Sequence, residues 1–537
     1  MAFLPLLWPA GRHAQPGARR SQYHAPGELG FYRDGMSMTA TMDESAAPGG
    51  PTGVTPGPAG AADGPAAGID ADRLALCLDV IAEAEQLDPE HPDAVAVRRA
   101  TAGLFKTVKL RRRRDRRDAI LANDRAVTAA TATGAPSRID DETAGIPLAT
   151  ATTTRSAGIL RQPRGCYICK QRYVRVDAFY HQLCPDCAAK NHSHRDARTD
   201  LTGRRALLTG GRAKIGMYIA LRLLRDGAHT TITTRFPNDA VRRFAAMPDS
   251  ADWLHRLRVV GIDLRDPGQV VALADSVAAR GPLDILINNA AQTVRRSPGS
   301  YAALVAAESA PLPDGPLPEL EYLGGHAMAA HPASLTDGSS FSPHALTALA
   351  LTGGSATPDR IAALTAIDAG GLVPDLAPTN SWSDKVHEVD ALELLEVQLC
   401  NVTAPFVLVS RLRAAMTRSP FPRRYVVNVS AMEGVFARGY KGAGHPHTNM
   451  AKAALNMLTR TSAAEMFTDG ILMTSVDTGW ITDERPHPTK MRLADEGFHA
   501  PLDLVDGAAR VYDPVVRGER GEDLYGVFLK DYAPIAW

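Results

Sequence analysis

Four cysteines in two pairs are the residues of this chain whose types and spacing most directly imply chemistry. Cys166 and Cys169 form one C-x-x-C pair, Cys184 and Cys187 form a second, and residues 170–183 separate the pairs. Two such pairs bring four thiolates together, and tetrahedral zinc prefers soft ligands of this kind. We expect a structural zinc site, with a redox dithiol pair as the alternative. Four thiolates leave no open position for zinc catalysis.

Three histidines lie close to these cysteines in the sequence, namely His181, His192 and His194. Because the four thiolates already complete a ligand set, we expect the histidines at the surface or behind the ligands. Modules of this type often dock onto other molecules. A protein partner bound through the zinc module is therefore a further expectation.

A glycine-rich turn at residues 207–216, LLTGGRAKIG, offers a second kind of chemistry. An apolar run leads through glycines into the helical pattern Met217–Arg225, which predicts a strand, a tight turn and a helix. A helix N-terminus approached in this way binds anions, because unpaired N–H groups and the helix dipole point at the ligand. Dinucleotide-binding βαβ units use such a turn. The glycines do not have the simple G-x-G-x-x-G spacing, so the turn alone is a weak indication.

The elements that must position these residues follow the turn to the end of the chain, where apolar strands alternate with helical patterns. This alternation predicts an α/β fold with a parallel, doubly wound sheet. The expected strands after the glycine turn are His229–Thr234, Arg258–Asp263, Leu283–Asn289, Tyr425–Ser430, Ile471–Asp477 and Leu524–Leu529, and the expected helices are Val270–Ala279, Leu392–Arg413 and Asn449–Glu465.

The part before residue 200 is organised differently. Residues 1–70 are rich in Gly, Pro, Ala and Ser, and we expect them to be disordered. Residues 71–125 predict a helical segment, with one helix ending near Pro89 and a second starting near Pro92. A Thr/Ala-rich linker is expected at 126–160 and the zinc module at 161–195.

The second of these helices contains the arginine-rich run RRRRDRRD, Arg111–Asp118. Such a run is typical of a patch for nucleic acid or an acidic partner, or of a solvated helix face. We favour the solvated face.

The composition and charge balance of the chain argue against some classes of function. The chain has 537 residues, with 45% hydrophobic and 22% charged, and Lys+Arg and Asp+Glu are both 59. This balance creates no global field for nucleic acid or an anionic membrane. No apolar run has membrane-spanning length, and the N-terminal apolar patch lacks the basic region of a secretory signal. The C-x-x-C pairs are typical of a reducing compartment, so we expect a cytoplasmic protein.

Residues 200–537 resemble the short-chain dehydrogenase/reductase family, interrupted by one insertion. The resemblance is carried by six segments in the family's order: the glycine motif, the pair that contacts adenine, the NNAG motif, the asparagine of the active-site helix, the lysine of Y-x-x-x-K and the loop that covers the nicotinamide. In this chain these segments are Thr209–Gly216, Asp263–Leu264, Asn288–Ala291, Asn401, Lys452 and Asp477–Thr482.

The resemblance implies a Rossmann domain that binds a nicotinamide dinucleotide. Arg235 ends the second strand, where an arginine suits a 2′-phosphate, so we favour NADP over NAD. The alternative is that Arg235 is an ordinary exposed residue. The expected cofactor-binding residues are Thr209, Gly210, Gly211, Arg212, Lys214, Ile215, Gly216, Arg235, Asp263, Leu264, Asn289, Ala290, Lys452, Gly479, Ile481 and Thr482.

The chain also departs from the family pattern. The family's tyrosine position is Thr448, and its serine position is Ala431, with Ser430 one place earlier. Lys214 replaces the central glycine of the cofactor motif, and Thr478 replaces the proline of the nicotinamide loop. The cofactor scaffold is kept, whereas two family catalytic groups are missing.

The missing proton donor requires a replacement, because threonine is a poor acid. Tyr440, His445 and His447 lie in a glycine-rich stretch that we expect to be a loop just before a helix. Histidine titrates near neutrality and suits this role. The alternative for each is a loop residue in solvent. The expected catalytic set is Asn401, Lys452, Tyr440, His447 and Ser430.

The insertion at about 295–383 is rich in Pro, Gly, Ala and Ser and falls at the carboxyl ends of the strands, where ligands bind in open α/β sheets. Long loops at this place are either lids or disordered segments. Trp382, near its end, either caps a substrate or packs on the sheet.

Two functions follow from these residues. The first is an NADP-dependent oxidoreductase with a non-standard acid, acting on a small carbonyl or alcohol. The second is a degenerate NADP(H)-binding sensor or scaffold that engages a partner through its zinc module. Nucleic-acid binding is the least favoured function, no membrane association is expected, and a homo-oligomer is compatible with the fold.

Overall fold

The computed structural model describes residues 68–136, 138, 155–323, 372–373, 375–439, 441–482 and 484–537. The chain divides into two compact units, residues 1–98 and 99–537. Most of the segment expected to be disordered, 1–70, lies outside the described residues, and so does the middle of the insertion.

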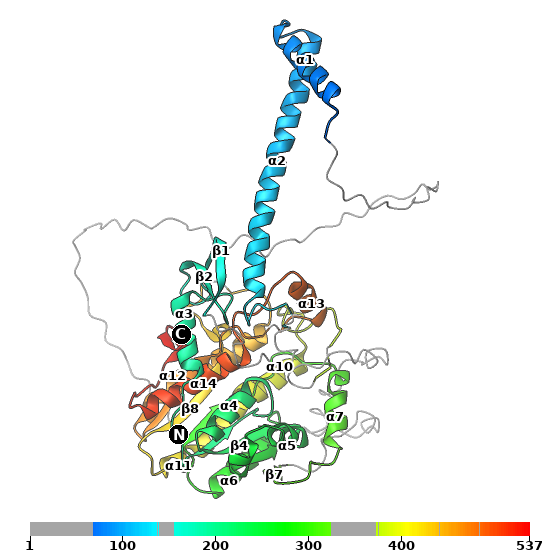
Figure 1. Ribbon diagram of the computed structural model, residues 1–537. Coiled ribbons are helices and arrows are strands. Elements are labelled where there is room, and N and C mark those ends of the chain that lie inside the picture. Colours follow the sequence, from blue (N-terminus) through cyan, green and yellow to red (C-terminus); the bar gives the residue numbers. More distant parts are fainter. Residues whose placement is uncertain are drawn as a thin grey trace, which may run out of the picture. The chain divides into compact units, whose positions relative to one another are not determined.

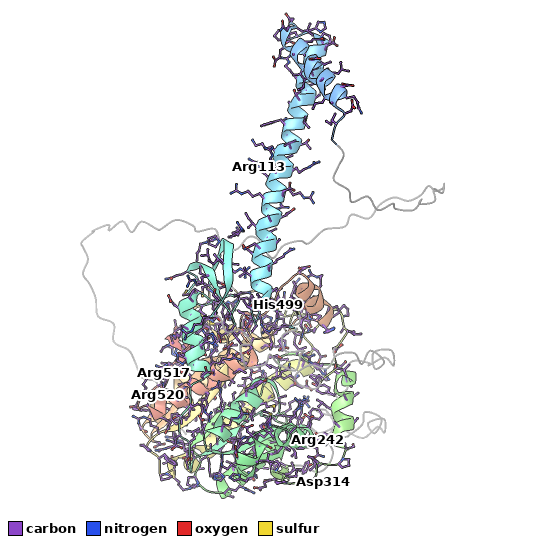
Figure 2. The ribbon with its side chains drawn as sticks, in the orientation of Figure 1. Arg113, Arg242, Asp314, His499, Arg517 and Arg520 are labelled. Atoms are coloured by element: carbon purple, nitrogen blue, oxygen red, sulfur yellow. The ribbon has the colours of Figure 1, made fainter. Side chains whose placement is uncertain are left out.

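Two helices precede the cysteines, as predicted. Helix α1, Ala71–Gln86, begins at Asp70, whose carboxylate accepts hydrogen bonds from two backbone N–H groups of the first turn. Helix α2, Pro92–Ala129, is 38 residues long. Its apolar residues Leu104 and Phe105 are 65% and 67% exposed, and the side chain of Arg113 stands away from the helix (Figure 2). The arginine-rich run therefore lies on a solvated stretch of helix.

The rest of the described chain is built on a nine-stranded sheet, which confirms the predicted α/β fold class (Figure 1). All neighbouring strands pair in parallel except β10 and β11, which form an antiparallel hairpin. The order is β11-β10-β9-β8-β6-β3-β4-β5-β7, with the strands β3 (Arg205–Leu208), β4 (His229–Thr234), β5 (Leu257–Gly261), β6 (Ile285–Asn288), β7 (Glu319–Tyr322), β8 (Arg424–Ser430), β9 (Ile471–Asp477), β10 (Phe528–Lys530) and β11 (Ala533–Ile535).

Helices cover both faces of this sheet, as a doubly wound fold requires. One core contains Ile219, Phe244 and Val511, from helices α4 (Lys214–Arg225), α5 (Pro237–Ala245) and α14 (Leu504–Glu519). The other core contains Leu273, Leu408 and Met466, from helices α6 (Pro267–Ala279), α11 (Ala404–Thr417) and α12 (Pro446–Phe467). The predicted strand–helix alternation is confirmed, but α14 was not predicted.

Shorter elements complete the part of the chain that the structure describes. The predicted helix 392–413 is divided into α10, a π-helical turn and α11. The short elements are η2 (Ser250–Asp252), η3 (Leu254–Arg256), η4 (Pro298–Tyr301), α7 (Ala302–Glu308), α10 (Ala391–Gln398), the π-helix η7 (Leu399–Thr403), η8 (Met432–Gly434) and α13 (His487–Asp495).

Part of the insertion is ordered sheet rather than a lid. Strand β7 pairs in parallel with β5 and extends the sheet by one strand. Its neighbour α7 ends at Glu308, whose carboxylate accepts the backbone N–H groups of Asn238 and Asp239 at the start of α5. The described beginning of the insertion is thus fixed to the sheet edge.

The four cysteines lie in a small module beside the sheet. Strands β1 (Ser156–Gly165) and β2 (Arg172–Asp177) form an antiparallel pair, followed by helix α3 (Pro185–Arg195). The expected linker 126–160 differs at both ends, because α2 continues to Ala129 and β1 already starts at Ser156. Residues between them pack against the module: the backbone N–H of Thr133 donates to Phe179 O at 2.9 Å, and Thr133 is buried.

One helical stretch, Ala391–Thr417, is long and apolar enough to cross a membrane by length and composition, with a mean hydropathy of 1.5 over its best window. It contributes Leu408 and Leu412 to the core beneath the sheet. A buried core helix passes the same test, so this stretch is weak evidence for a membrane span.

Candidate cofactor site and cysteine cluster

The glycine turn after β3 is packed so closely that side chains are excluded. A Cβ on Gly216 would lie 1.9 Å from the carbonyl oxygen of Gly210, and Gly210 itself has φ +70°. Lys214, which replaces the family's central glycine, has φ +52°. The backbone therefore keeps the glycine conformation although the side chain has changed, and a lysine in this left-handed region is strained.

The NNAA segment after β6 locks this turn in place. Thr209 Oγ1 accepts hydrogen bonds from the backbone N–H groups of Asn289 and Ala290, both at 3.0 Å. The Asn289 side-chain amide donates to the carbonyls of Thr209 and Gly210, both at 3.1 Å. Strands β3 and β6 are neighbours at the point where the strand order reverses, which is where doubly wound sheets bind ligands.

Charged residues cluster at the ends of β4 and β5, where the adenosine half of a dinucleotide is expected. Arg235 Nη2 donates to Tyr301 Oη at 3.3 Å, and its guanidinium lies 5.1 Å from the Tyr301 ring centre. Arg212 is paired with Asp239 at 2.5 Å. Arg235 therefore contacts a phenol, whereas Arg212 is paired with a carboxylate.

The predicted adenine-contacting pair is partly committed to other contacts. The Asp263 carboxylate is held by the guanidinium of Arg265, which keeps the Asp263 pKa below its ordinary value despite burial. Arg265 also pairs with Glu396 at 2.9 Å. Leu264 is buried in the core that contains α6.

Lys452 and Asn401 lie on two elements that pack against each other, α12 and the π-helix η7. Lys452 Nζ donates to Val429 O at 2.9 Å, and burial lowers the pKa of Lys452 to about 8. Asn401 Oδ1 accepts the backbone N–H of Gln292 at 2.7 Å, and its Nδ2 donates to Gln292 O at 2.9 Å. The buried Ser430 hydroxyl lies 3.5 Å from Lys452 O. These predicted residues are therefore brought together.

His447 lies in the first turn of α12, not in the loop that was predicted, because the helix starts at Pro446. Its side chain is buried, and both ring nitrogens lack a hydrogen-bond partner among the described residues, as does Thr448 Oγ1. Nε2 of His447 is 4.0 Å from Glu393 Oε1. Burial lowers the pKa of His447 and raises the pKa of Glu393. Both groups therefore tend to be neutral.

The other two candidate proton donors are His445 and Tyr440. His445 precedes the helix with φ +42°, donates from Nδ1 to Trp382 O at 2.9 Å and stacks on the Trp382 ring at 4.0 Å. Trp382 thus packs on a histidine rather than on the sheet. Tyr440 lies outside the described residues.

A polar cleft of about 600 Å³ opens beside Glu393. It lies between the start of the insertion, the segment around residue 380 and the segment that follows the predicted nicotinamide loop. Carboxylates and basic groups both line it; the charged lining residues are Arg295, Arg296, Asp375, Asp384, Asp390, Glu393, Glu484, Arg485, His487 and Lys490.

The predicted nicotinamide loop starts at the end of β9 and is tied on two sides. Asp477 accepts the backbone N–H of Met432 at 3.1 Å and pairs with Lys530 at 3.2 Å. Gly479 has φ +78°, and a Cβ there would lie 2.6 Å from Leu502. Ile481 is buried, and Thr482 Oγ1 contacts Glu484 at 3.3 Å.

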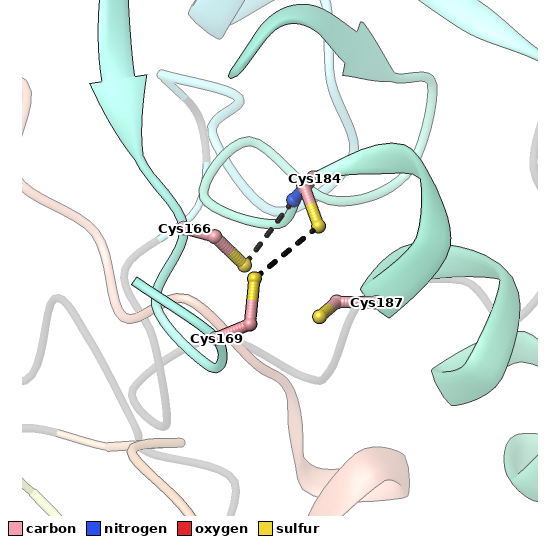
Figure 3. A group of neighbouring side chains, drawn as sticks. All are labelled: Cys166, Cys169, Cys184 and Cys187. Carbon is pink, nitrogen blue, oxygen red and sulfur yellow. Dashed lines mark hydrogen bonds between the residues drawn. The ribbon is translucent and has the colours of Figure 1, made fainter. Parts of the chain in front are cut away.

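The four predicted metal ligands converge (Figure 3). All four sulfur atoms lie within 4.8 Å of one another, and Cys169 Sγ is 3.7 Å from Cys184 Sγ. Tetrahedral zinc with Zn–S distances of about 2.3 Å separates its sulfurs by about 3.8 Å, whereas a disulfide brings them to about 2.0 Å. The geometry therefore fits a shared metal ion, and all four thiols are free.

The three neighbouring histidines, expected at the surface or behind the ligands, differ in burial. His181 is buried and its Nδ1 lies 2.8 Å from Thr133 Oγ1. His192 contacts Asp177 at 3.2 Å, and His194 contacts Asp513 of α14 at 2.8 Å. Two of the three thus fix the module internally and one fixes it to the Rossmann domain.

Sequence reasoning missed the residues that join the module to the sheet. Tyr180 Oη donates to Asp506 at 2.6 Å, and Arg195 forms a two-pronged ion pair with Asp503 at 2.6 and 2.7 Å. Tyr167, inside the first C-x-x-C pair, was also missed. The available signal was local: a tyrosine between two metal ligands, and a capping pattern at Asp503 followed by an apolar helix.

Comparison with known families places the fold. Residues 204–304 match the family model for short chain dehydrogenase, and they contain the glycine turn, β3 to β6 and the NNAA segment. This part of the chain is thus similar to the short-chain dehydrogenase/reductase family, in a divergent form.

Three curated relatives differ in extent. An uncharacterized protein of Acanthamoeba polyphaga mimivirus is 29% identical over 370 residues, covering 66% of this chain and 71% of that protein. A probable oxidoreductase of Streptomyces antibioticus is 43% identical over 94 residues, covering 17% of this chain and 30% of that protein. A short-chain type dehydrogenase/reductase of Picea abies is 35% identical, covering 18% and 38%. This chain thus matches well under half the length of the two relatives named as oxidoreductases.

Solved structures resemble the chain less closely. The NADPH-bound carbonyl reductase from chicken fatty liver is 17% identical, covers 63% of this chain and 100% of its own, and has a TM-score of 0.37. The Pseudomonas aeruginosa RhlG/NADP active-site complex is 17% identical, covers 62% and 95%, and has a TM-score of 0.38. This low level of similarity does not indicate which reaction this protein catalyses.

Proposed function

We propose that the protein is an NADP(H)-dependent oxidoreductase that interconverts a small carbonyl compound and its alcohol. The observation that carries the proposal is the lock between the glycine turn and the NNAA segment at the strand-order reversal, with the Thr209, Asn289 and Ala290 contacts in place. A site that no longer held a dinucleotide would have no need for this close backbone packing. Lys452 and Asn401, which are buried beside it, support a cofactor site whose nicotinamide-binding half is also retained.

Arg235 supports NADP rather than NAD. It is the basic residue at the end of β4 whose described contacts are to aromatic rings, Phe236 and Tyr301, rather than to a carboxylate. A guanidinium with no paired carboxylate suits a 2′-phosphate. Lys452 would contact ribose hydroxyls, and the loop 477–482 would cover the nicotinamide.

The bound cofactor would supply or accept a hydride at the substrate carbon. His447 would donate the proton that the developing alkoxide oxygen takes up, and Glu393, 4.0 Å away, would return a proton to the ring. Burial raises the pKa of Glu393 and lowers the pKa of His447, and both shifts favour the protonated carboxyl and the neutral ring that this relay uses. The polar cleft beside Glu393 would hold a polar substrate.

The test is a comparison of binding and turnover in the full chain. Wild type should bind NADPH, measured by titration calorimetry, and should oxidise it with some member of a panel of polar aldehydes and ketones. Glutamine is close to histidine in size but cannot relay a proton. Turnover of His447→Gln should therefore fall about 100-fold or more while the NADPH Kd stays nearly unchanged. His229→Gln, at the amino end of β4 and so at the other end of the strands from the candidate site, is the control. Failure of wild type to bind NADPH contradicts the proposal.

A second candidate, an NADP(H)-binding sensor or scaffold, is favoured by Thr448 and Ala431 at the family's tyrosine and serine positions. It expects NADPH binding with no oxidation by any carbonyl tried. In that case Thr448→Tyr combined with Ala431→Ser should create carbonyl reduction, because the rest of the scaffold is present.

A further inference from the structure

The cysteine module and the predicted nicotinamide loop share one hydrophobic core. Cys166 and Cys184 lie in the same buried cluster as Ile481 and Leu502, and Ile215 of the glycine turn packs against it. Ile481 and Ile215 are both among the residues expected to contact the cofactor. The module is thus part of the wall of the cofactor site, not a separate appendage.

A single polar contact joins the first C-x-x-C pair to the loop. The backbone N–H of Trp480 donates to Tyr167 Oη at 2.9 Å. Tyr167 lies between Cys166 and Cys169, and its own backbone N–H donates to Gln182 O at 2.8 Å. A metal that fixes both cysteines therefore also fixes the ring of Tyr167.

Among the described residues, two hydrogen bonds hold the middle of the loop, both at Trp480, and the one to Tyr167 is the shorter. Asp477 fixes the start through Met432 and Lys530, and the backbone N–H of Leu502 reaches Trp480 O at only 3.3 Å. Lys530 Nζ also lies 5.7 Å from the Tyr167 ring centre, so the amine that holds Asp477 flanks the same tyrosine. Trp480 itself is 40% exposed, and its ring lies 5.2 Å from the Phe498 ring between centres.

We propose that Tyr167 is a positioning residue of the cofactor site, through which the metal bound by the four cysteines holds the nicotinamide loop in its cofactor-covering conformation. This inference rests on the proposed function, because it takes the loop 477–482 to contact NADP(H). Loss of the metal should then weaken binding of the nicotinamide half of NADP(H) and leave binding of the adenosine half unchanged.

The first test needs no cofactor. In Tyr167→Phe, the Trp480 amide loses its acceptor, so hydrogen exchange of the peptide covering residues 478–482 should become about 5-fold faster or more, as for the loss of about 1 kcal/mol. Protein stripped of metal with a chelator should show the same change. Tyr173→Phe is the matched control: it removes a buried hydroxyl of the same module, which donates to His181 O at 2.9 Å, away from the loop. Unchanged exchange in Tyr167→Phe overturns the inference whatever the cofactor result.

The second test compares two ligands by titration calorimetry. Tyr167→Phe and metal-stripped protein should bind NADPH about 5-fold more weakly, yet bind adenosine 2′,5′-bisphosphate as wild type does. Equal loss of both ligands, or loss of neither, overturns the inference. Wild type that binds neither ligand overturns the proposed function instead, and the exchange experiment still decides whether Tyr167 positions the loop.

Discussion

Lys452 is the residue whose chemistry its surroundings alter most clearly. Its amine is buried and, among the described residues, donates a hydrogen bond to Val429 O, and burial lowers its pKa from 10.5 to about 8. In the unfolded chain the amine regains its ordinary pKa. Between pH 8 and 10.5 the folded protein therefore binds fewer protons than the unfolded one, and this difference makes stability rise with pH over that window.

Replacement of Lys452 by methionine tests this linkage. The charged amine costs stability below pH 8 and ceases to do so as pH rises to 10.5. The unfolding free energy of wild type minus that of Lys452→Met should therefore rise by up to about 3 kcal/mol between pH 7 and 10.5. Urea denaturation of the two proteins without cofactor measures both unfolding free energies. Lys109→Met, on the exposed face of α2, should give a flat difference; a flat line for Lys452→Met as well would mean that its amine is not desolvated.

Arg235 carries the prediction about cofactor choice. Arg235→Ala removes a cation that has no ion pair among the described residues, although Asp263 lies near enough to attract it, so the change should weaken NADPH binding about 10- to 100-fold and change NADH binding less than about 2-fold. Arg242→Ala, on α5, is the control, because that guanidinium is engaged by the carbonyls of Ala307 and Ala310 (Figure 2). Titration of each variant with both nucleotides decides; equal losses for the two would place Arg235 away from the 2′-phosphate.

At the scale of elements, sequence patterns located the sheet strands except β7 and β11 and the sheet-facing helices except α5 and α14, and β4 and β9 have the predicted bounds. β9, ILMTSVD, begins with an apolar run typical of a buried strand, and β4, HTTITT, is rich in the β-branched residues that strands favour. Helix α14 escaped because its sequence, LVDGAARVYDPVVRGE, contains charges, glycines and an internal Pro514. Its buried charges are satisfied by distant partners, such as Arg195 for Asp503 and Asn191 for Arg510. No local pattern announces such partners.

The candidate site shows the same limit. The cysteine cluster and the glycine turn depend on spacing, so they could be found from the sequence. The position of His447 in the first turn of α12, beside Glu393 of α10, depends on how two helices pack. The contact between Tyr167 and Trp480 joins segments about 300 residues apart and has no sequence signature.

The packing of η8 against α12 makes Gly434 sensitive to substitution. A Cβ at Gly434 would lie 2.5 Å from the Lys452 backbone carbon, so Gly434→Ala must push the two elements apart. We expect a loss of about 1–3 kcal/mol in unfolding free energy and weaker NADPH binding, because Lys452 moves. Gly439→Ala, in the same loop with open space around its Cβ position, should be nearly neutral. Denaturation curves of the two variants give the comparison, and equal stabilities would contradict the close packing.

At the scale of the whole molecule, direct side-chain contacts hold the cysteine module against the Rossmann domain, so the two are not joined by the chain alone. Within the unit formed by residues 99–537, Arg195 pairs with Asp503, Tyr180 donates to Asp506, and His194 stacks on Tyr532 at 3.8 Å. The Arg195 and Tyr180 contacts reach the N-terminal turn of α14, and α14 covers one face of the sheet. A change in the module must therefore be transmitted to the sheet core.

Removal of the metal should accordingly destabilise the Rossmann domain itself. Purified chain should contain about one zinc, and Cys166→Ser should lose it. A structural zinc site contributes directly to folding free energy, so the thermal midpoint of the single main transition should fall by about 5 °C or more in this variant and in chelated wild type. Cys77→Ser, which changes an exposed cysteine outside the cluster, should keep both the zinc and the midpoint. If zinc is lost while the midpoint stays, or if the module melts in a separate earlier transition, the module and the sheet are not one cooperative unit, and the shared core around Ile481 and Leu502 does not couple them.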